Sequence, residues 1–232
     1  MKRTIRLLAV LAMSAALAFA ACGKDDDNDN NGGDTGMETA EWVDLGLPSG
    51  LLWAKCNLGA TTPEGHGDYY AWGETATKEV YNWSTYKYCT ASAEDTPQTL
   101  TKYITSTPWQ TSDNLTTLQA IDDVATQKLG DGARMPTADE WYELINNTTA
   151  EWTAAGRKFT AANGNSLFLP AAGNRWGSEL GGAGEDGYYW SSSLYADFPY
   201  CAWTFYFNSV GQDMCGDPGR GNGFSVRAVR QN

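Results

Sequence analysis

The sequence predicts an α+β domain in which two helices precede most of the strands. Apolar residues recur at helical spacing in two segments between positions 118 and 147, whereas short strand-like runs dominate from position 166 onward. The composition agrees, because 10 Trp, 12 Tyr and 25 Gly with only 19% charged residues are typical of a loop-rich fold and not of a helical bundle. No Pro- or Ser-rich break interrupts residues 41–232, so we expect them to form one domain.

Residues 1–21 predict a lipoprotein signal peptide. A positively charged start is followed by an apolar run from Leu7 to Ala18 that is too short to span a bilayer, and small residues precede Cys22. This ending resembles a bacterial lipobox, although Phe19 stands where Leu is preferred. The resemblance implies cleavage before Cys22 and lipidation of that residue. The alternative is an ordinary signal peptide cut near Ala21, with Cys22 as a free thiol.

Residues 22–40 predict a flexible acidic tether. No residue between Cys22 and Met37 is apolar, so this stretch adds nothing to a core. The Lys24-Asp25-Asp26-Asp27 run resembles the acidic surface-export signal of Bacteroidetes lipoproteins. That resemblance implies an outer-membrane lipoprotein displayed on the cell surface and attached to the membrane through its lipid only. A simple solvated linker is the alternative.

The charge of the chain argues against nucleic acid as a partner. The chain has 16 Lys and Arg against 28 Asp and Glu, a formal net charge of -12, and loss of the three basic residues of the signal peptide makes it -15. Such a chain offers no positive field to a phosphate backbone. Neighbouring carboxylates such as Asp122-Asp123 do not by themselves indicate a glycosidase, and we expect this pair on the solvated face of a helix.

The first half of the domain should contain three short strands and a helix. Trp42–Leu47 and Leu51–Ala54 predict strands around the turn Pro48–Gly50, and Tyr69–Trp72 predicts a third strand. The next element is a helix over Leu118–Leu129 that Gly130 ends. Its expected inner face consists of Leu118, Ile121, Ala125 and Leu129.

A second helix should begin at Thr137, because Thr137-Ala-Asp-Glu140 has the sequence of a capping box. Trp141, Leu144 and Ile145 would face inward, and the helix should end at Asn146-Asn147. The later strands are expected at residues 166–169, 187–190, 202–207 and 224–229.

Four cysteines remain after Cys22, namely Cys56, Cys89, Cys201 and Cys215. In an oxidising compartment, sequence order favours disulfides between Cys56 and Cys89 and between Cys201 and Cys215, and the other pairings stay open. The chain has no Cys-x-x-Cys motif and a single histidine, His66, in a segment of turn composition. We therefore expect no metal site, no cofactor and no catalytic residues.

Six blocks of sequence in consistent order carry a family resemblance: residues 43–60, 67–74, 134–141, 165–173, 189–193 and 223–227. Together they resemble the Fibrobacter succinogenes major paralogous domain of Bacteroidetes lipoproteins. Arg134-Met-Pro-Thr-Ala-Asp-Glu-Trp141 and Gly223-Phe-Ser-Val-Arg227 are also similar to the wider C-type lectin-like group, which includes formylglycine-generating enzymes and the targets of diversity-generating retroelements. The resemblance implies a C-type lectin-like fold, in which two helices brace a small twisted antiparallel sheet and a long irregular segment presents the ligand-binding surface.

That surface is expected between Tyr195 and Gly221, an irregular stretch between two of the blocks. Alternation would turn Trp203, Phe205 and Phe207 inward and leave a Tyr- and Asp-rich set for the ligand, as in an antibody paratope. The alternative is that these aromatic residues only fill the core. The predicted ligand-binding residues are Leu194, Tyr195, Asp197, Phe198, Tyr200, Cys201, Thr204, Tyr206, Asn208, Asp213, Cys215, Asp217 and Arg220.

The sequence thus predicts a surface-displayed binding protein, not an enzyme, whose partner is an unknown extracellular protein or glycan. The resemblance to retroelement targets implies that the segment could be diversified. In residues 194–221, only Trp203, Gln212 and Met214 lie outside the set that adenine-directed mutagenesis of Asn-type codons reaches. Two alternatives stay open. One is a copper-dependent oxidase of the formylglycine-generating type using Cys201 and Cys215, although their spacing is too wide for that family's close pair. The other is a structural component of a surface assembly.

Overall fold

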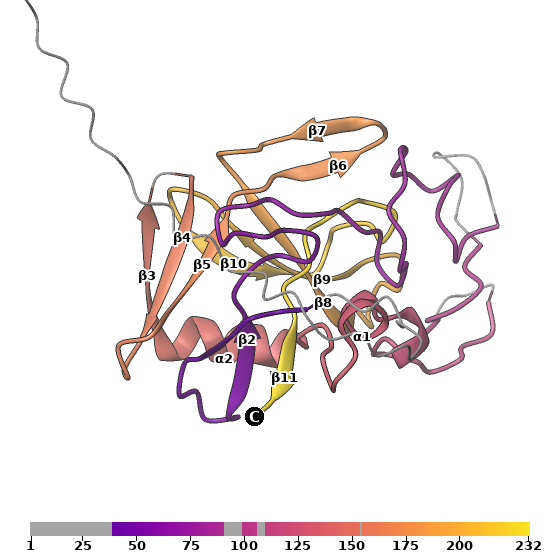
Figure 1. The fold of residues 1–232 in the computed structure, drawn as a ribbon. Coiled ribbons are helices and arrows are strands. Elements are labelled where there is room, and N and C mark those ends of the chain that lie inside the picture. Colours follow the sequence, from indigo (N-terminus) through magenta and orange to yellow (C-terminus); the bar gives the residue numbers. More distant parts are fainter. Residues whose placement is uncertain (1–38, 91–98, 106–109, 154) are drawn as a thin grey trace, which may run out of the picture. The chain divides into compact units, whose positions relative to one another are not determined.

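Four small antiparallel sheets organise the part of the chain that the computed structural model describes, residues 39–90, 99–105, 110–153 and 155–232 (Figure 1). The predicted signal peptide, Cys22 and the tether up to residue 38 lie outside these residues. Within them, no helix is both long and apolar enough to cross a membrane. The strands are β1 (Trp42–Asp44), β2 (Leu51–Ala54), β3 (Thr148–Thr153), β4 (Gly156–Ala161), β5 (Ser166–Pro170), β6 (Asn174–Trp176), β7 (Glu179–Gly181), β8 (Gly187–Leu194), β9 (Ala202–Phe207), β10 (Gln212–Cys215) and β11 (Val229–Gln231).

The strands assemble into three three-stranded sheets and one hairpin. The sheets have the orders β1-β2-β11, β10-β9-β8 and β3-β4-β5, and β6 and β7 form the hairpin. Two α-helices, α1 (Val124–Leu129) and α2 (Ala138–Asn147), and the short 3-10 helix η1 (Ala120–Asp122) complete the described elements. Figure 1 shows α2 below the β3-β4-β5 sheet and the β6–β7 hairpin at the top of the view.

The predicted α+β class, with one twisted sheet braced by two helices as in a C-type lectin-like fold, is wrong. The described chain is mostly β, with eleven strands in four small sheets and only two α-helices. Five of these strands, β3, β4, β6, β7 and β10, lie in segments where the sequence predicts no regular element. Pairing with a neighbouring strand stabilises these five strands more than any local pattern does.

Helix α2 has the predicted start, inner face and end. The Thr137 hydroxyl accepts a hydrogen bond from the Glu140 amide (3.3 Å), and the Glu140 carboxylate accepts one from the Thr137 amide (2.8 Å), which completes the capping box. Trp141 and Leu144 are fully buried. The Trp141 ring stacks on Phe205 of β9 with the ring centroids 4.9 Å apart, so α2 packs firmly on the β10-β9-β8 sheet.

The first predicted helix is broken into two pieces. η1 ends at Asp122, and Asp123 starts α1 because its carboxylate accepts a hydrogen bond from the Thr126 amide (3.1 Å). As a result Ile121, expected on the inner face, is 63% exposed, whereas Asp122 and Asp123, expected on a solvated face, are buried. Gly130 ends α1 as predicted, with a positive φ of 60°.

The predicted β1–β2 hairpin and strands β5, β8 and β9 are present. In contrast, Tyr69–Trp72 and Phe224–Val229 are not continuous strands. Tyr70 and Phe224 form a single bridge, and regular pairing starts only at Val229. Both segments contribute fully buried side chains, such as Trp72 and Val226, so packing in the core rather than a strand ladder sets their position.

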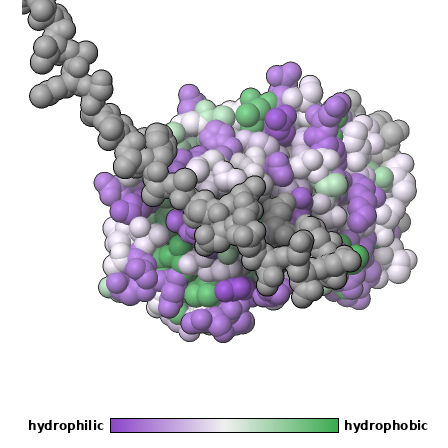
Figure 2. Space-filling view, viewed as in Figure 1, coloured by the Kyte–Doolittle hydropathy of each residue, from purple (hydrophilic) through white to green (hydrophobic). Residues whose placement is uncertain are grey.

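Two clusters of buried hydrophobic residues form the core. One surrounds Trp72 and Trp190, and the other surrounds Trp53 and Trp141 where α2 meets the sheets. In Figure 2, hydrophobic residues reach the visible surface in small separate areas among polar ones. A group of exposed aromatic side chains on such a protein is therefore informative.

Candidate functional site

The segment from Tyr195 to Cys201, called the aromatic turn below, follows β8 and carries an exposed ring. Its backbone closes through a hydrogen bond from the Tyr195 amide to the Cys201 carbonyl oxygen (3.2 Å). Phe198 is 54% exposed. The ring centroid of Tyr200 lies 5.2 Å from that of Phe198 and 6.3 Å from that of Trp83. Three rings from two distant parts of the sequence thus form a continuous aromatic group.

Arg220, predicted to contact a ligand, is instead fully buried beneath the aromatic turn. Its guanidinium donates hydrogen bonds to the carbonyl oxygens of Pro199 (2.8 Å), Lys102 (2.9 Å) and Tyr103 (3.1 Å). It also lies 4.9 Å from the centre of the Trp72 ring. Because its N–H donors are satisfied by backbone oxygens from two segments and by the Tyr86 hydroxyl (2.8 Å), Arg220 holds the turn against the core.

The β10-β9-β8 sheet brings a second group of predicted residues together on the face that points away from α2. The strand register places Tyr188, Tyr206 and Asp213 side by side across the three strands. Cys215 follows in the next row of the same face, because side chains two positions apart share a face. We define the tyrosine face as Asp186, Tyr188, Tyr206, Asp213, Cys215 and Asp217.

The alternation predicted for β9 is correct at most positions. Phe205 and Phe207 point inward and are fully buried. Trp203 is only partly buried, and its ring lies 5.1 Å from that of Tyr195. Thr204, expected to face the ligand, is fully buried because the core covers this part of the sheet. Of the two outward-facing β9 residues, only Tyr206 reaches the surface.

Carboxylates make the tyrosine face electrically negative. The Tyr206 hydroxyl donates a hydrogen bond to the Asp186 carboxylate (2.7 Å) and accepts one from the side-chain amide of Asn208 (2.7 Å). Burial, and after it the Asp186 carboxylate, raise the pKa of Tyr206 to about 12. Burial also raises the pKa of Tyr188, and nearby negative groups, Asp186 first among them, raise it further. A positive group brought to this face would therefore be stabilised.

Cys201 and Cys215 both contact Asp217 and do not form the predicted disulfide. The Cys201 thiol donates to the Asp217 carbonyl oxygen (3.0 Å), and the Cys215 thiol donates to the Asp217 carboxylate. Burial, and after it Asp217, raise the pKa of Cys201 to about 12, so this thiol is protonated at neutral pH. The predicted disulfide between Cys56 and Cys89 is not formed either, since Cys56 is a free thiol.

No three His, Cys, Asp or Glu side chains are grouped so as to hold a metal ion in the part of the chain that the structure describes. His66 lies half-buried in the loop before Tyr69, where its carbonyl oxygen accepts a hydrogen bond from Asn57 (2.9 Å).

The structure brings most of the predicted ligand-binding residues together on the aromatic turn and the tyrosine face. Asp197, Phe198, Asp213 and Asp217 are exposed, and Tyr195, Tyr200, Tyr206, Asn208 and Cys215 are half-exposed. Leu194, Cys201, Thr204 and Arg220 are buried and offer no side chain to a ligand. The Asn208 side chain mainly stabilises its own turn, because it accepts hydrogen bonds from the two amides that follow Ser209.

Sequence reasoning missed three residues of this region. Asp186 and Tyr188 lie just before and within β8, and alternation against the buried Tyr189 could have placed Tyr188 on the outer face. No local sequence pattern could have identified Trp83, because its position beside Tyr200 depends on packing between distant segments.

A buried polar cluster centred on Asp122 supports the same region. Its carboxylate accepts hydrogen bonds from the hydroxyls of Tyr103 (2.7 Å) and Tyr88 and from the Lys102 ammonium (2.6 Å). Burial by itself would raise the pKa of Asp122, but these hydrogen bonds outweigh it and lower the pKa to about 2. The Tyr103 carbonyl oxygen binds Arg220, so the cluster stabilises the base of the aromatic turn.

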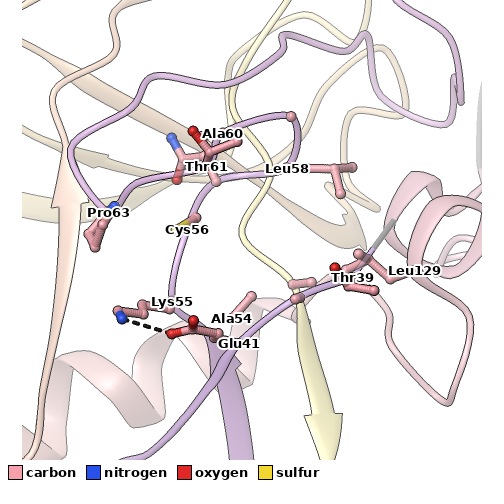
Figure 3. Close-up of a pocket in the computed structure, with 14 residues that line it drawn as sticks. Thr39, Glu41, Ala54, Lys55, Cys56, Leu58, Ala60, Thr61, Pro63 and Leu129 are labelled. Atoms are coloured by element: carbon pink, nitrogen blue, oxygen red, sulfur yellow. Dashed lines mark hydrogen bonds and ion pairs between the residues drawn. The ribbon is translucent and has the colours of Figure 1, made fainter. Parts of the chain in front are cut away.

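A pocket of about 370 Å³ lies at the start of β1 and contains none of the predicted ligand-binding residues. Figure 3 shows Cys56 in its wall and an ion pair of 2.8 Å between Lys55 and Glu41. Burial raises the pKa of Cys56, and the nearby Arg227 and Lys55 partly oppose this shift. The residues that line the pocket and those of the aromatic turn and the tyrosine face do not overlap.

No family model, curated protein or solved structure matches this chain. The resemblance to the Fibrobacter succinogenes major paralogous domain stays a prediction that depends on the sequence blocks. Function is accordingly inferred from the geometry of the aromatic turn and the tyrosine face.

Proposed function

We propose that this protein is a surface-displayed lipoprotein that binds an external ligand through the aromatic turn and the tyrosine face. The exposure of Phe198 supports binding most directly, since 54% of this large apolar side chain contacts water beside the rings of Tyr200 and Trp83. Exposure of grouped aromatic rings to water is unfavourable. A partner that covers these rings removes them from water, which favours binding. Aromatic side chains are also those that contribute most to protein interfaces.

Hydrogen bonds within the chain hold the residues of the proposed site in place. Arg220 holds the aromatic turn through Pro199, and the hydrogen bond to Asp186 fixes the Tyr206 ring. A surface that is already in its binding conformation loses less conformational entropy on association. In this arrangement the rings supply contact area, and exposed carboxylates such as Asp197 orient the ligand.

Binding can be tested on cells that display the full chain. Phe198→Ala combined with Tyr200→Ala removes two rings of the aromatic turn, whereas Tyr142→Ala removes a ring that is 38% exposed on α2. Proteolysis of intact cells first checks that each variant is displayed. The cells are then applied to arrays of extracellular proteins and glycans.

We expect the parent and the Tyr142→Ala variant to bind the same array component and the double variant to lose it. If the double variant binds every component as the parent does, the ligand site lies elsewhere. If protease leaves the displayed chain intact on unbroken cells, the proposed surface location is wrong.

A further inference from the structure

All exposed charged side chains in residues 194–221, the segment predicted to bind the ligand, are negative. Residues 194–221 contain three acidic residues and one basic residue. The acidic residues Asp197, Asp213 and Asp217 are all exposed, whereas the basic residue, Arg220, is 0% exposed. Burial of the single cation beneath the turn leaves a surface on which only carboxylates face the solvent.

Positive side chains in the neighbouring segment are occupied by carboxylates of the same chain. Lys102 forms an ion pair with Asp122 (2.6 Å), and Lys87 contacts the same carboxylate (3.3 Å). Lys78 pairs with Glu74 (2.9 Å). Lys87 and Lys102 share one carboxylate, so this group keeps one positive charge, which the three exposed aspartates of residues 194–221 outnumber.

Arginine side chains stack on aromatic rings at several places in this protein. The guanidinium carbons of Arg220, Arg230 and Arg175 lie 4.9, 4.6 and 5.2 Å from the ring centres of Trp72, Trp42 and Tyr69 respectively. Such cation–π contacts combine an aromatic face with a positive group. The aromatic turn offers the same kind of ring, with Phe198 exposed and Tyr200 half-exposed, and the exposed Asp197 directly precedes Phe198 in the chain.

We infer that the ligand of this surface is a cationic protein segment, whose arginine or lysine side chains stack on Phe198 and Tyr200 and pair with Asp197 and Asp217. Charge complementarity supports this partner over an uncharged glycan or an acidic protein, because the only exposed charges of the segment are negative. The inference rests on the proposed binding function and adds the chemical class of the ligand.

The probe is a fluorescent peptide of alternating arginine and glycine, with the glutamate–glycine peptide as its control. Fluorescence polarisation measures binding to the purified full chain in a non-ionic detergent, at low and at physiological salt. We expect the arginine peptide to bind, the glutamate peptide not to bind, and affinity to fall as salt rises. Asp197→Asn with Asp217→Asn should weaken binding about tenfold, and Phe198→Ala should weaken it about fivefold.

Glu151→Gln is the matched control, because it removes an exposed carboxylate on β3. It should change affinity less than twofold. Equal weakening per removed charge by Glu151→Gln and by the double aspartate variant would show non-specific attraction to an acidic chain and overturn the inference. If the arginine peptide does not bind, while an array component still requires Phe198 and Tyr200, the ligand class is wrong and the proposed function stands. If neither binds, both fail.

Discussion

At the scale of single residues, two buried arginines determine how irregular segments pack. Arg220 and Arg227 are both 0% exposed. Arg227 donates hydrogen bonds to the carbonyl oxygens of Ala54 (2.9 Å) and Lys55 (2.6 Å), and burial lowers its pKa. Backbone carbonyls in loops have no strand partner, so a buried guanidinium satisfies several of them at once. These arginines therefore supply backbone carbonyl oxygens with hydrogen bonds that a neighbouring strand supplies within a sheet.

Replacing Arg220 by Ala should strongly destabilise the fold. The variant leaves the carbonyl oxygens of Pro199 and Lys102 buried without a donor, so we expect the free energy of unfolding to fall by roughly 3 kcal/mol. Chemical denaturation measures this change, and amide hydrogen exchange should show faster exchange in the aromatic turn. Arg230→Ala, which removes a half-exposed arginine, is the comparison. Unchanged exchange in residues 195–201 would contradict the role given to Arg220.

Asp122 should make stability depend on pH in the acid range. Its folded pKa of about 2 lies below the ordinary value of 3.8, so the carboxylate stabilises the fold above about pH 4 and loses this contribution as the pH falls toward 2. Asp122→Asn should reduce that part of the loss and also lower stability at neutral pH. Urea denaturation at a series of pH values measures both effects.

The exposed Glu151→Gln variant should keep the acid-induced loss of the parent. A parent stability that stays constant between about pH 4 and 2 would contradict the hydrogen-bonded state of Asp122.

At the scale of elements, a glycine at the start of a strand explains why β4 was missed, and the same close packing recurs at Gly187 of the predicted strand β8. A Cβ atom at Gly156 of β4 would lie 2.5 Å from the Leu169 carbonyl oxygen, and one at Gly187 of β8 would lie 2.2 Å from the Phe207 ring. In a sequence such glycines indicate turns, yet in this fold they make room for the neighbouring strand. Local patterns therefore underestimate the strand content of this chain.

The capping box of α2 should contribute a measurable part of the stability. Thr137→Ala removes the acceptor of the Glu140 amide, and we expect the free energy of unfolding to fall by about 1 kcal/mol. Thr62→Ala, which alters an exposed loop threonine, should change it by less than about 0.5 kcal/mol. Chemical denaturation of both variants measures the change in the free energy of unfolding. Equal stability of the two would mean that the capping hydrogen bond adds nothing.

At the scale of the whole molecule, the segment from Leu194 to Gly221 is divided between scaffold and surface. Thr204 and Arg220 are fully buried, whereas Asp197, Phe198 and Asp217 face the solvent. Substitution at the buried positions would disturb the core, and substitution at the exposed ones would change only the surface. The fold can therefore carry different surfaces without losing its packing.

Natural variation should follow this division if the segment is a diversified binding surface. Codon alignment of the gene from several isolates should show changes concentrated at Asp197, Phe198, Tyr200 and Asp213, with Arg220 invariant. The buried residues outside the segment, such as Trp141, serve as the internal control. An alignment in which codons 194–221 vary no more than the rest of the gene would argue against diversification and favour a fixed ligand.

Local sequence patterns predict the elements whose signals come from neighbouring residues. Helix α2 with its capping box, the β1–β2 hairpin, the end of α1 at Gly130 and the inward rings of Phe205 and Phe207 all depend on neighbours within a few positions. Only the tertiary structure decided that Arg220 is buried and that Trp83 lies beside Tyr200. These features, like the short paired strands, depend on contacts between distant segments, and the free energy of such contacts is not encoded in any local pattern.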